Sequence, residues 1–340
     1  MTENPTPRQM VDELLRGVPP PRPLFLPIVF SLGAKLENLP LSTFLGNATK
    51  ISNSLRQIRS HLRTDGVASY FDPYLEVEAL GAALTWGAED QRPTVRWPDH
   101  AAKGELPHRL RSPEDAAKRS RVSVAIEVIR RLKSLLRDGS LITASVTGPF
   151  TLAARITQLE SEDPLRCEDL PDAALDVATC LMAQMSAAFV EAGADLIFIQ
   201  EEVLPHLTAE SCEAWSLRLA PTLNIIRFYH ALPVLHLTSS RAFTESGAAI
   251  MQQHWDCVVC PTLDVGLPLT TRTSQSKENV LGVSLPPDAL LPDQASEDDF
   301  DEFLRRALSE LRPAILTTAG DLPAGTDTNR LIRVSKLVNG

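Results

Sequence analysis

The 340-residue sequence has no apolar stretch that approaches the length of a membrane-spanning helix. Such a helix needs roughly 20 consecutive apolar residues. The opening residues, MTENPTPRQM, are polar and proline-containing and lack the apolar centre of a signal peptide. The sequence therefore predicts a cytoplasmic protein with no membrane partner.

Positive charge is also scarce, because 33 Lys and Arg residues face 43 Asp and Glu residues and leave a formal net charge of −10. The basic residues are scattered, apart from two pairs at Arg119, Arg121 and Arg130, Arg131. Proteins that bind nucleic acid present a basic face to the phosphate backbone. We therefore expect no nucleic-acid partner.

Cysteine is sparse, with five residues that lie between Cys167 and Cys260. The number is odd and the spacing does not match a disulfide framework, so free thiols are expected. Any functional cysteine would then act in metal binding or in chemistry.

Apolar runs bounded by Pro, Gly or Asp alternate with segments of helical periodicity, and 44% of the residues are hydrophobic. This alternation is typical of βαβ units in a parallel sheet. Eight strands and four clear helices predict one (β/α)8 TIM barrel over residues 1–340, with an N-terminal extension (1–22) and a long loop with a short hairpin (85–110). The expected strands are Leu24–Val29, Val67–Ser69, Leu141–Val146, Leu196–Ile199, Val234–Leu237, Cys257–Cys260, Val280–Val283 and Ala314–Thr317. The expected helices are Pro113–Leu136, Pro171–Ala192, Ala209–Tyr229 and Glu297–Leu311.

Five motif blocks follow one another along nearly the whole chain. They are residues 65–81 (DGV to EALG), 146–152 (VTGPFTL), 192–201 (AGAD to a strand-end QE), 233–236 (PVLH), and the last two strands at 282–286 and 315–323. In this order the blocks resemble the uroporphyrinogen decarboxylase superfamily, which also contains the zinc-dependent methylcobamide:thiol methyltransferases. The resemblance implies the same barrel, with its reactive groups at the carboxyl ends of the strands.

The departures from the family pattern bear on the reaction. Decarboxylases of the family carry an arginine-rich strand end that binds substrate carboxylates, whereas residues 29–35 here read VFSLGAK. The methyltransferases bind zinc through a His-x-Cys motif and a later cysteine. His236 is kept here, but Thr238 and Gly320 stand in the cysteine positions.

Three residues at expected strand ends are candidates for catalysis. Asp72 lies where the family keeps a substrate-orienting aspartate, and a helix-capping or turn role is its alternative. Glu201 could act as general base or metal ligand, with a loop salt bridge as the alternative. We favour it over Glu202 because adjacent residues on a strand face opposite ways. His236 is a ligand, an acid or base, or a hydrogen-bonded structural histidine.

A metal site is expected to use His236 with Cys260 and Glu201, although a buried structural cysteine is the more common role for a residue such as Cys260. The resembling segments also suggest a set of substrate-binding residues, for which structural roles in turns, loops or packing are the alternative. This set is Phe30, Gly148, Phe150, Arg155 and His206.

The leading hypothesis is transfer of a one-carbon methyl group involving a corrinoid or a thiol. Its cofactor candidates are zinc and a corrinoid carried by a partner protein. A decarboxylase-like lyase acting on a porphyrin-related or smaller carboxylic acid is the first alternative, and a non-catalytic ligand-binding barrel is the second. The candidate partners are a small-molecule substrate, a corrinoid protein and a second copy of the chain.

Overall fold

A computed structural model describes residues 5–87, 93–98, 102–136, 139–161, 165–261, 279–291, 297–323 and 325–339. Within these ranges, eight parallel strands form one sheet in the order β1-β10-β9-β8-β7-β6-β5-β2. Their bounds are β1 Leu24–Phe25, β2 Gly66–Ala68, β5 Leu141–Thr147, β6 Leu196–Glu201, β7 Leu232–Leu237, β8 Cys257–Pro261, β9 Val280–Leu285 and β10 Ile315–Thr318. All eight predicted strands are confirmed, although β1 is shorter than expected.

The first and last strands of this order, β1 and β2, meet through Asp65. The Asp65 main-chain N–H donates to the Phe25 carbonyl at 3.1 Å, and its carboxylate accepts the Phe25 N–H at 2.8 Å. These bonds bring the two ends of the sheet together. The fold is the (β/α)8 barrel that the sequence predicts.

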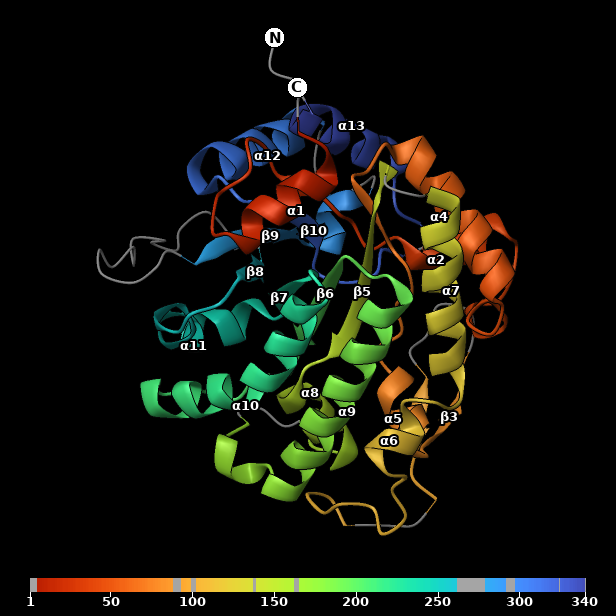
Figure 1. Cartoon of the computed structure of the whole chain (residues 1–340), viewed down its shortest axis with the longest axis vertical. Helices are drawn as coiled ribbons and strands as arrows, with labels where there is room; N and C mark the ends of the chain where they lie inside the picture. Colours follow the sequence, from red (N-terminus) through yellow and green to blue (C-terminus); the bar gives the residue numbers. More distant parts are fainter. Residues whose placement is uncertain are drawn as a thin grey trace.

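Helices surround the strands, and α4, α7, α9 and α10 lie one beside the next along one side (Figure 1). The predicted helix 113–136 is two helices, α6 and α7, because Ser120 adopts a left-handed conformation with φ 54° between them. The helix bounds are α1 Pro7–Leu15, α2 Phe30–Leu36, α3 Leu41–Phe44, α4 Ala48–Leu62, α5 Leu75–Leu80, α6 Pro113–Ala116, α7 Arg121–Leu136, α8 Pro149–Ile156, α9 Asp172–Ala192, α10 Ala209–Phe228, α11 Ser240–Gln252, α12 Glu297–Leu311 and α13 Thr328–Asn339.

Two further segments match features of the sequence. The long loop contains an antiparallel hairpin of β3 (Ala83–Thr85) and β4 (Thr94–Arg96); parts of residues 85–110 lie outside the described residues. The N-terminal extension contains α1. Its residues Met10, Val11 and Leu14 pack against the interior of the barrel at the amino ends of the strands.

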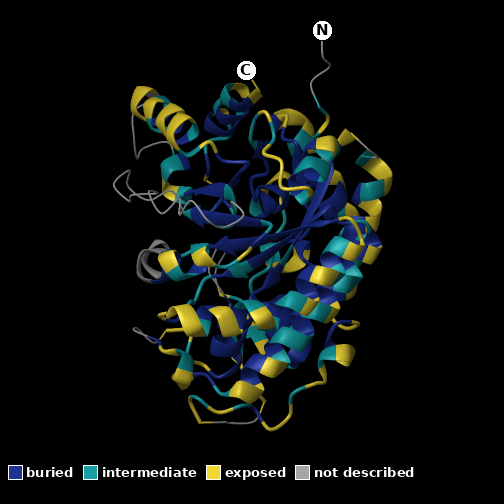
Figure 2. Cartoon of the chain, turned by 60° about the vertical axis from the view of Figure 1, so that its left-hand side comes forward, coloured by how far each residue is buried: buried dark blue, intermediate teal, exposed yellow. Residues whose placement is uncertain are grey.

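Side chains alternate between the inside of the barrel and the helix layer. Leu196 and Phe198 of β6 belong to the interior cluster with α1, whereas Ile197 and Ile199 pack with the surrounding helices. Figure 2 shows buried strands enclosed by helices with exposed outer faces. This period of two decides which strand-end residues can face a ligand.

Contrary to the expectation from the sequence, the helix α9 is long and apolar enough to span a membrane by length and composition, and half of its most apolar window is buried in the fold. It packs against α7, α8 and α10. A core helix meets the same criterion, so the composition of α9 alone does not indicate a membrane span.

Candidate active site

The interior of the barrel is polar near the carboxyl ends of the strands. It is apolar near their amino ends. Following the alternation along each strand, the inward-facing positions near the carboxyl ends are Ser145 and Thr147 on β5, Gln200 on β6 and His236 on β7. Gln200 and His236 are register partners on adjacent strands. In barrels of this kind, reactive groups gather at this end because the loops converge there.

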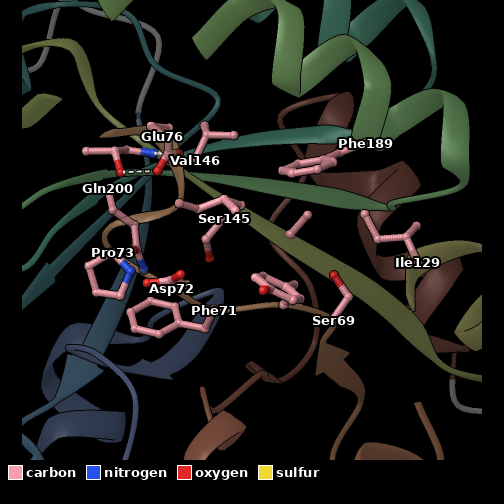
Figure 3. A pocket seen from close by; sticks show the side chains of 14 residues that line it. Ser69, Phe71, Asp72, Pro73, Glu76, Ile129, Ser145, Val146, Phe189 and Gln200 are labelled. Atoms are coloured by element: carbon pink, nitrogen blue, oxygen red, sulfur yellow. Dashed lines mark hydrogen bonds between the residues drawn. The ribbon is translucent and has the colours of Figure 1, made fainter. Parts of the chain in front are cut away.

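A small cavity, referred to below as the pocket, lies where the chain after β2 separates from the longer strand β5. The Asp72 carboxylate and the Ser145 hydroxyl both point into it (Figure 3). Gln200 forms part of the wall, so the pocket adjoins the polar interior of the barrel. It also has an apolar side, formed by Ile129, Phe189 and Val146.

Asp72 is held by an ion pair with Arg121 at the start of α7. The exposed fraction of the Asp72 side chain is only 2%. Arg121 also donates to Glu78 at 2.6 Å, and its guanidinium lies 5.7 Å from the Trp86 ring centroid. Burial raises the pKa of the Asp72 carboxyl, and the neighbouring Arg121 charge opposes that rise. Asp72 thus lies in the pocket with an oriented carboxylate.

Glu76 supports the same pocket from α5. Its carboxylate accepts the Thr147 N–H at 2.8 Å and the Thr147 hydroxyl at 2.9 Å. The strand β5 continues past the point where its neighbour β2 ends at Ala68. The Glu76 side chain bonds the Thr147 N–H in this part of β5. Burial is the main cause that raises the pKa of Glu76.

His236 is fully buried, with 0% of its surface exposed. Its Nδ1 lies 3.3 Å from the Gln200 amide nitrogen, and its ring meets Phe198 edge-on with the centroids 5.6 Å apart. The Nε2 atom has no hydrogen-bond partner among the described residues. Burial lowers the pKa of His236 to about 3. The imidazole is therefore neutral at physiological pH and has one buried nitrogen, Nε2, without a hydrogen-bond partner among the described residues.

Glu201, another of the catalytic candidates, does not line the pocket that contains Asp72. Its carboxylate lies at the start of α8, where it accepts the Phe150 N–H at 3.1 Å, the Thr151 N–H at 2.8 Å and the Thr151 hydroxyl at 2.6 Å. The physical reason is strand alternation, which turns Gln200 inward and Glu201 toward the helix layer. Burial raises the pKa of Glu201 to about 7, opposed by these hydrogen bonds.

The three expected metal ligands do not converge. His236 faces the barrel interior, whereas Cys260 packs in the helix-side cluster and Glu201 caps α8. Thr238 hydrogen-bonds the Glu201 carbonyl through both its N–H and its hydroxyl. Within the described ranges, no group of three or more His, Cys, Asp or Glu side chains is placed to hold a metal ion. These residues therefore do not fit the zinc of the related methyltransferases.

Arg155 was expected to bind substrate, but its guanidinium is already engaged. It donates to Glu202 at 2.6 Å, to Glu160 at 3.2 Å and to the Pro73 carbonyl, and it lies over the Tyr74 ring at 5.3 Å. The side chain is 4% exposed. It thus ties the loops after β2 and β6 to α8 and has no obvious nitrogen left for a substrate.

The other expected substrate-binding residues have different surroundings. Phe30 is buried between Phe44 and Tyr70, with ring centroids 5.2 Å from each. Phe150 packs against Trp215 on the helix side, and His206 is exposed in the loop before α10. Gly148 lies against Glu201. The structure does not bring these residues together around the pocket.

Several residues of the site were missed in the sequence. Gln200 could have been found by carrying strand alternation one residue further, and Arg121 stood out in an otherwise scattered set of basic residues. Glu76 was hidden in a helical stretch. Asp321 follows β10 and accepts the Ser31 N–H at 2.9 Å at the start of α2, where burial raises its pKa to about 7.

The barrel and its buried polar site at the strand ends define a TIM-barrel protein of the kind that carries enzymes of many classes. Residues 6–324 match the family model described as Uroporphyrinogen decarboxylase (URO-D). The chain belongs to this family.

Similar proteins include methyltransferases. The chain is 28% identical over 131 residues to the methylcobamide:CoM methyltransferase MtaA of Methanosarcina barkeri, and the match spans 37% of the length of that relative. A methyltransferase from Methanosarcina mazei has a similar structure, with a TM-score of 0.78, 19% identity, and 98% of this chain and 99% of that chain covered. A B12-independent methionine synthase from Shewanella sp. W3-18-1 shares the fold more distantly, with a TM-score of 0.51, 13% identity, and 86% and 88% covered.

Proposed function

We propose that the protein is a methyltransferase-like enzyme that moves a methyl group between a corrinoid and a small thiol. The observation that carries this proposal is His236, which lies on the inner face of β7 and whose buried Nε2 has no hydrogen-bond partner among the described residues. His236 also occupies the position where the resembling methyltransferases carry the histidine of their His-x-Cys motif, although Thr238 stands in the cysteine position here. The similarity to a methylcobamide:CoM methyltransferase supports the same class of reaction.

In the proposed reaction a thiolate sulfur attacks the methyl carbon of a methylcobamide. The sulfur–carbon bond forms as the cobalt–carbon bond breaks, and the electron pair of the broken bond stays on cobalt. The thiol proton is released to solvent or to a base. In this proposal the chain orients the acceptor at the carboxyl ends of the strands near Gln200, which lines the pocket of Asp72 and contacts His236.

A decarboxylase-like lyase is the second candidate, because Asp72 points into the pocket and could stabilise a cationic intermediate of a small acid. Asp72 is already paired with Arg121, which weakens its field toward a substrate. The methyltransferase proposal therefore has the stronger support.

The test is an absorbance assay with purified full-length protein, methylcobalamin and a panel of small thiols. We expect loss of methylcobalamin that depends on both protein and thiol, and a rate that falls by about 100-fold in His236→Ala, the loss typical of removing one oriented hydrogen-bonding group. His254→Ala, at an exposed histidine, should retain the rate. An inactive wild type, or a fully active His236→Ala, would reject the proposal, and release of carbon dioxide from a small acid would favour the lyase.

A further inference from the structure

The His236 ring is held in one orientation by two neighbours from β6. Gln200 approaches Nδ1 at 3.3 Å, and Phe198 meets the ring edge-on. All three side chains lie on the inner face of the barrel, and His236 has no exposed surface. A ring packed in this way cannot rotate freely to exchange the places of its two nitrogens.

With the Gln200 amide oriented as the structure places it, the contact with Nδ1 favours one tautomer of the neutral imidazole. The atom of Gln200 that faces Nδ1 is the amide nitrogen, which carries hydrogens and has no lone pair to offer. In this amide orientation Nδ1 accepts the hydrogen bond and carries no proton. In the neutral ring, the single proton therefore belongs to Nε2.

Nε2 is the atom that lacks a partner among the described residues. A buried N–H without an acceptor is costly, and such groups in native proteins usually mark a place where water or a ligand binds. A protonated Nε2 has no lone pair and cannot bind a metal ion. This agrees with the surroundings, where Thr238 bonds the Glu201 carbonyl and Gly320 has no side chain.

We infer that His236 acts as an Nε2–H hydrogen-bond donor to the bound ligand, with Gln200 as its positioning residue, and not as a metal ligand. The ligand atom that it fits is a hydrogen-bond acceptor, such as a thiolate sulfur or a carboxylate oxygen. In a site without water, this N–H stabilises negative charge on that atom. The inference rests on the proposed function only in treating this ligand as the substrate.

The tautomer can be measured without turnover, by long-range 1H–15N NMR of full-length protein labelled with 15N-histidine. His236→Gln identifies the His236 signals by their loss. We expect Nδ1 to resonate as an unprotonated nitrogen and Nε2 as an N–H. Titration with 2-mercaptoethanol and with acetate, as a minimal thiol and a minimal carboxylate, should shift the His236 Nε2–H signal.

Two variants of Gln200 test its positioning role. In Gln200→Glu, the carboxylate accepts a proton from Nδ1 and leaves a lone pair on Nε2, so the NMR pattern should reverse and zinc affinity should rise by about 10-fold or more. In Gln200→Leu, both tautomers should be populated. Gln184→Glu is the matched control on the exposed face of α9 and should change neither readout.

Three results would overturn the inference. The first is a wild-type ring with the proton on Nδ1. The second is one equivalent of zinc bound by wild type and lost in His236→Gln. The third is a Nε2–H signal that neither probe shifts. Because methyl transfer is not measured, an inactive enzyme with the expected tautomer would refute the proposed function and leave this inference standing.

Discussion

Gly148 and Glu201 fit together so closely that position 148 has no room for a side chain. A Cβ at Gly148 would lie 2.7 Å from the Glu201 Cγ and nearer still to the carboxyl group. The Gly148 N–H also donates to the Gln200 carbonyl at 2.7 Å. The glycine thereby lets the end of β6 approach the start of α8, and the Glu201 carboxylate can bond the first N–H groups of that helix.

Gly148→Ala should destabilise the protein by about 1–3 kcal/mol, because the new methyl group displaces Glu201 from the helix start. The measurement is the free energy of unfolding from urea denaturation followed by circular dichroism. Gly320→Ala is the matched control at another strand end, since a Cβ there would meet no atom within 4 Å. A Gly148→Ala variant as stable as Gly320→Ala would contradict the close contact.

Glu201→Gln should alter how stability depends on pH. Burial raises the pKa of Glu201 in the folded chain from 4.5 to about 7. Because the pKa is higher in the folded chain than in the unfolded chain, the contribution of Glu201 to the free energy of unfolding is fully present below pH 4.5. It is lost as the pH rises through 7. Between pH 5 and pH 8 the wild type should therefore lose on the order of 2 kcal/mol that the glutamine variant does not lose.

The comparison of unfolding free energies at these two pH values checks the sign as well as the size. Asp321 has the same direction of shift and His236 the opposite one, so only the difference between wild type and variant reports Glu201. Equal pH dependence in both proteins would show that Glu201 is ionised at little cost.

The sequence was sufficient to predict the barrel, because strand and helix periods are local properties that leave a repeated apolar pattern. It was insufficient at the strand ends, where a shift of one residue exchanges the inside and the outside of the barrel. This is why Glu201 was expected in place of Gln200. Cys260 was grouped with His236 for the same reason, although it faces the helices.

Contacts between side chains that are far apart in the sequence could not be predicted either. Asp72 could be selected by its place in a motif, but nothing near it in the chain indicates Arg121, which is 49 residues away. Arg155 was assigned to substrate because its charge looked free in the sequence. The fold neutralises it with Glu202 and Glu160, which the spacing alone could not reveal.

A double-mutant cycle should reveal strong coupling between Asp72 and Arg121. Asp72→Asn should cost about 3 kcal/mol of stability, because it leaves a largely buried guanidinium with Glu78 as its main partner. In an Arg121→Met background the same change should cost at least about 1 kcal/mol less. Equal costs in both backgrounds, measured by urea denaturation, would mean that the ion pair does not hold Asp72.

The protein should not convert uroporphyrinogen III to coproporphyrinogen. That substrate carries eight carboxylates, and in a partly desolvated pocket each needs a counter-charge. Two arginines that bond residues of the pocket lining are already neutralised, Arg121 by Asp72 and Glu78 and Arg155 by Glu160 and Glu202. The segment at residues 29–35, where the resemblance places the arginines of the decarboxylases, has no arginine and contains the buried Phe30. Chromatography of the oxidised porphyrins, with an authentic decarboxylase as positive control, is the measurement, and coproporphyrin above the enzyme-free background would show that other cations complete the site.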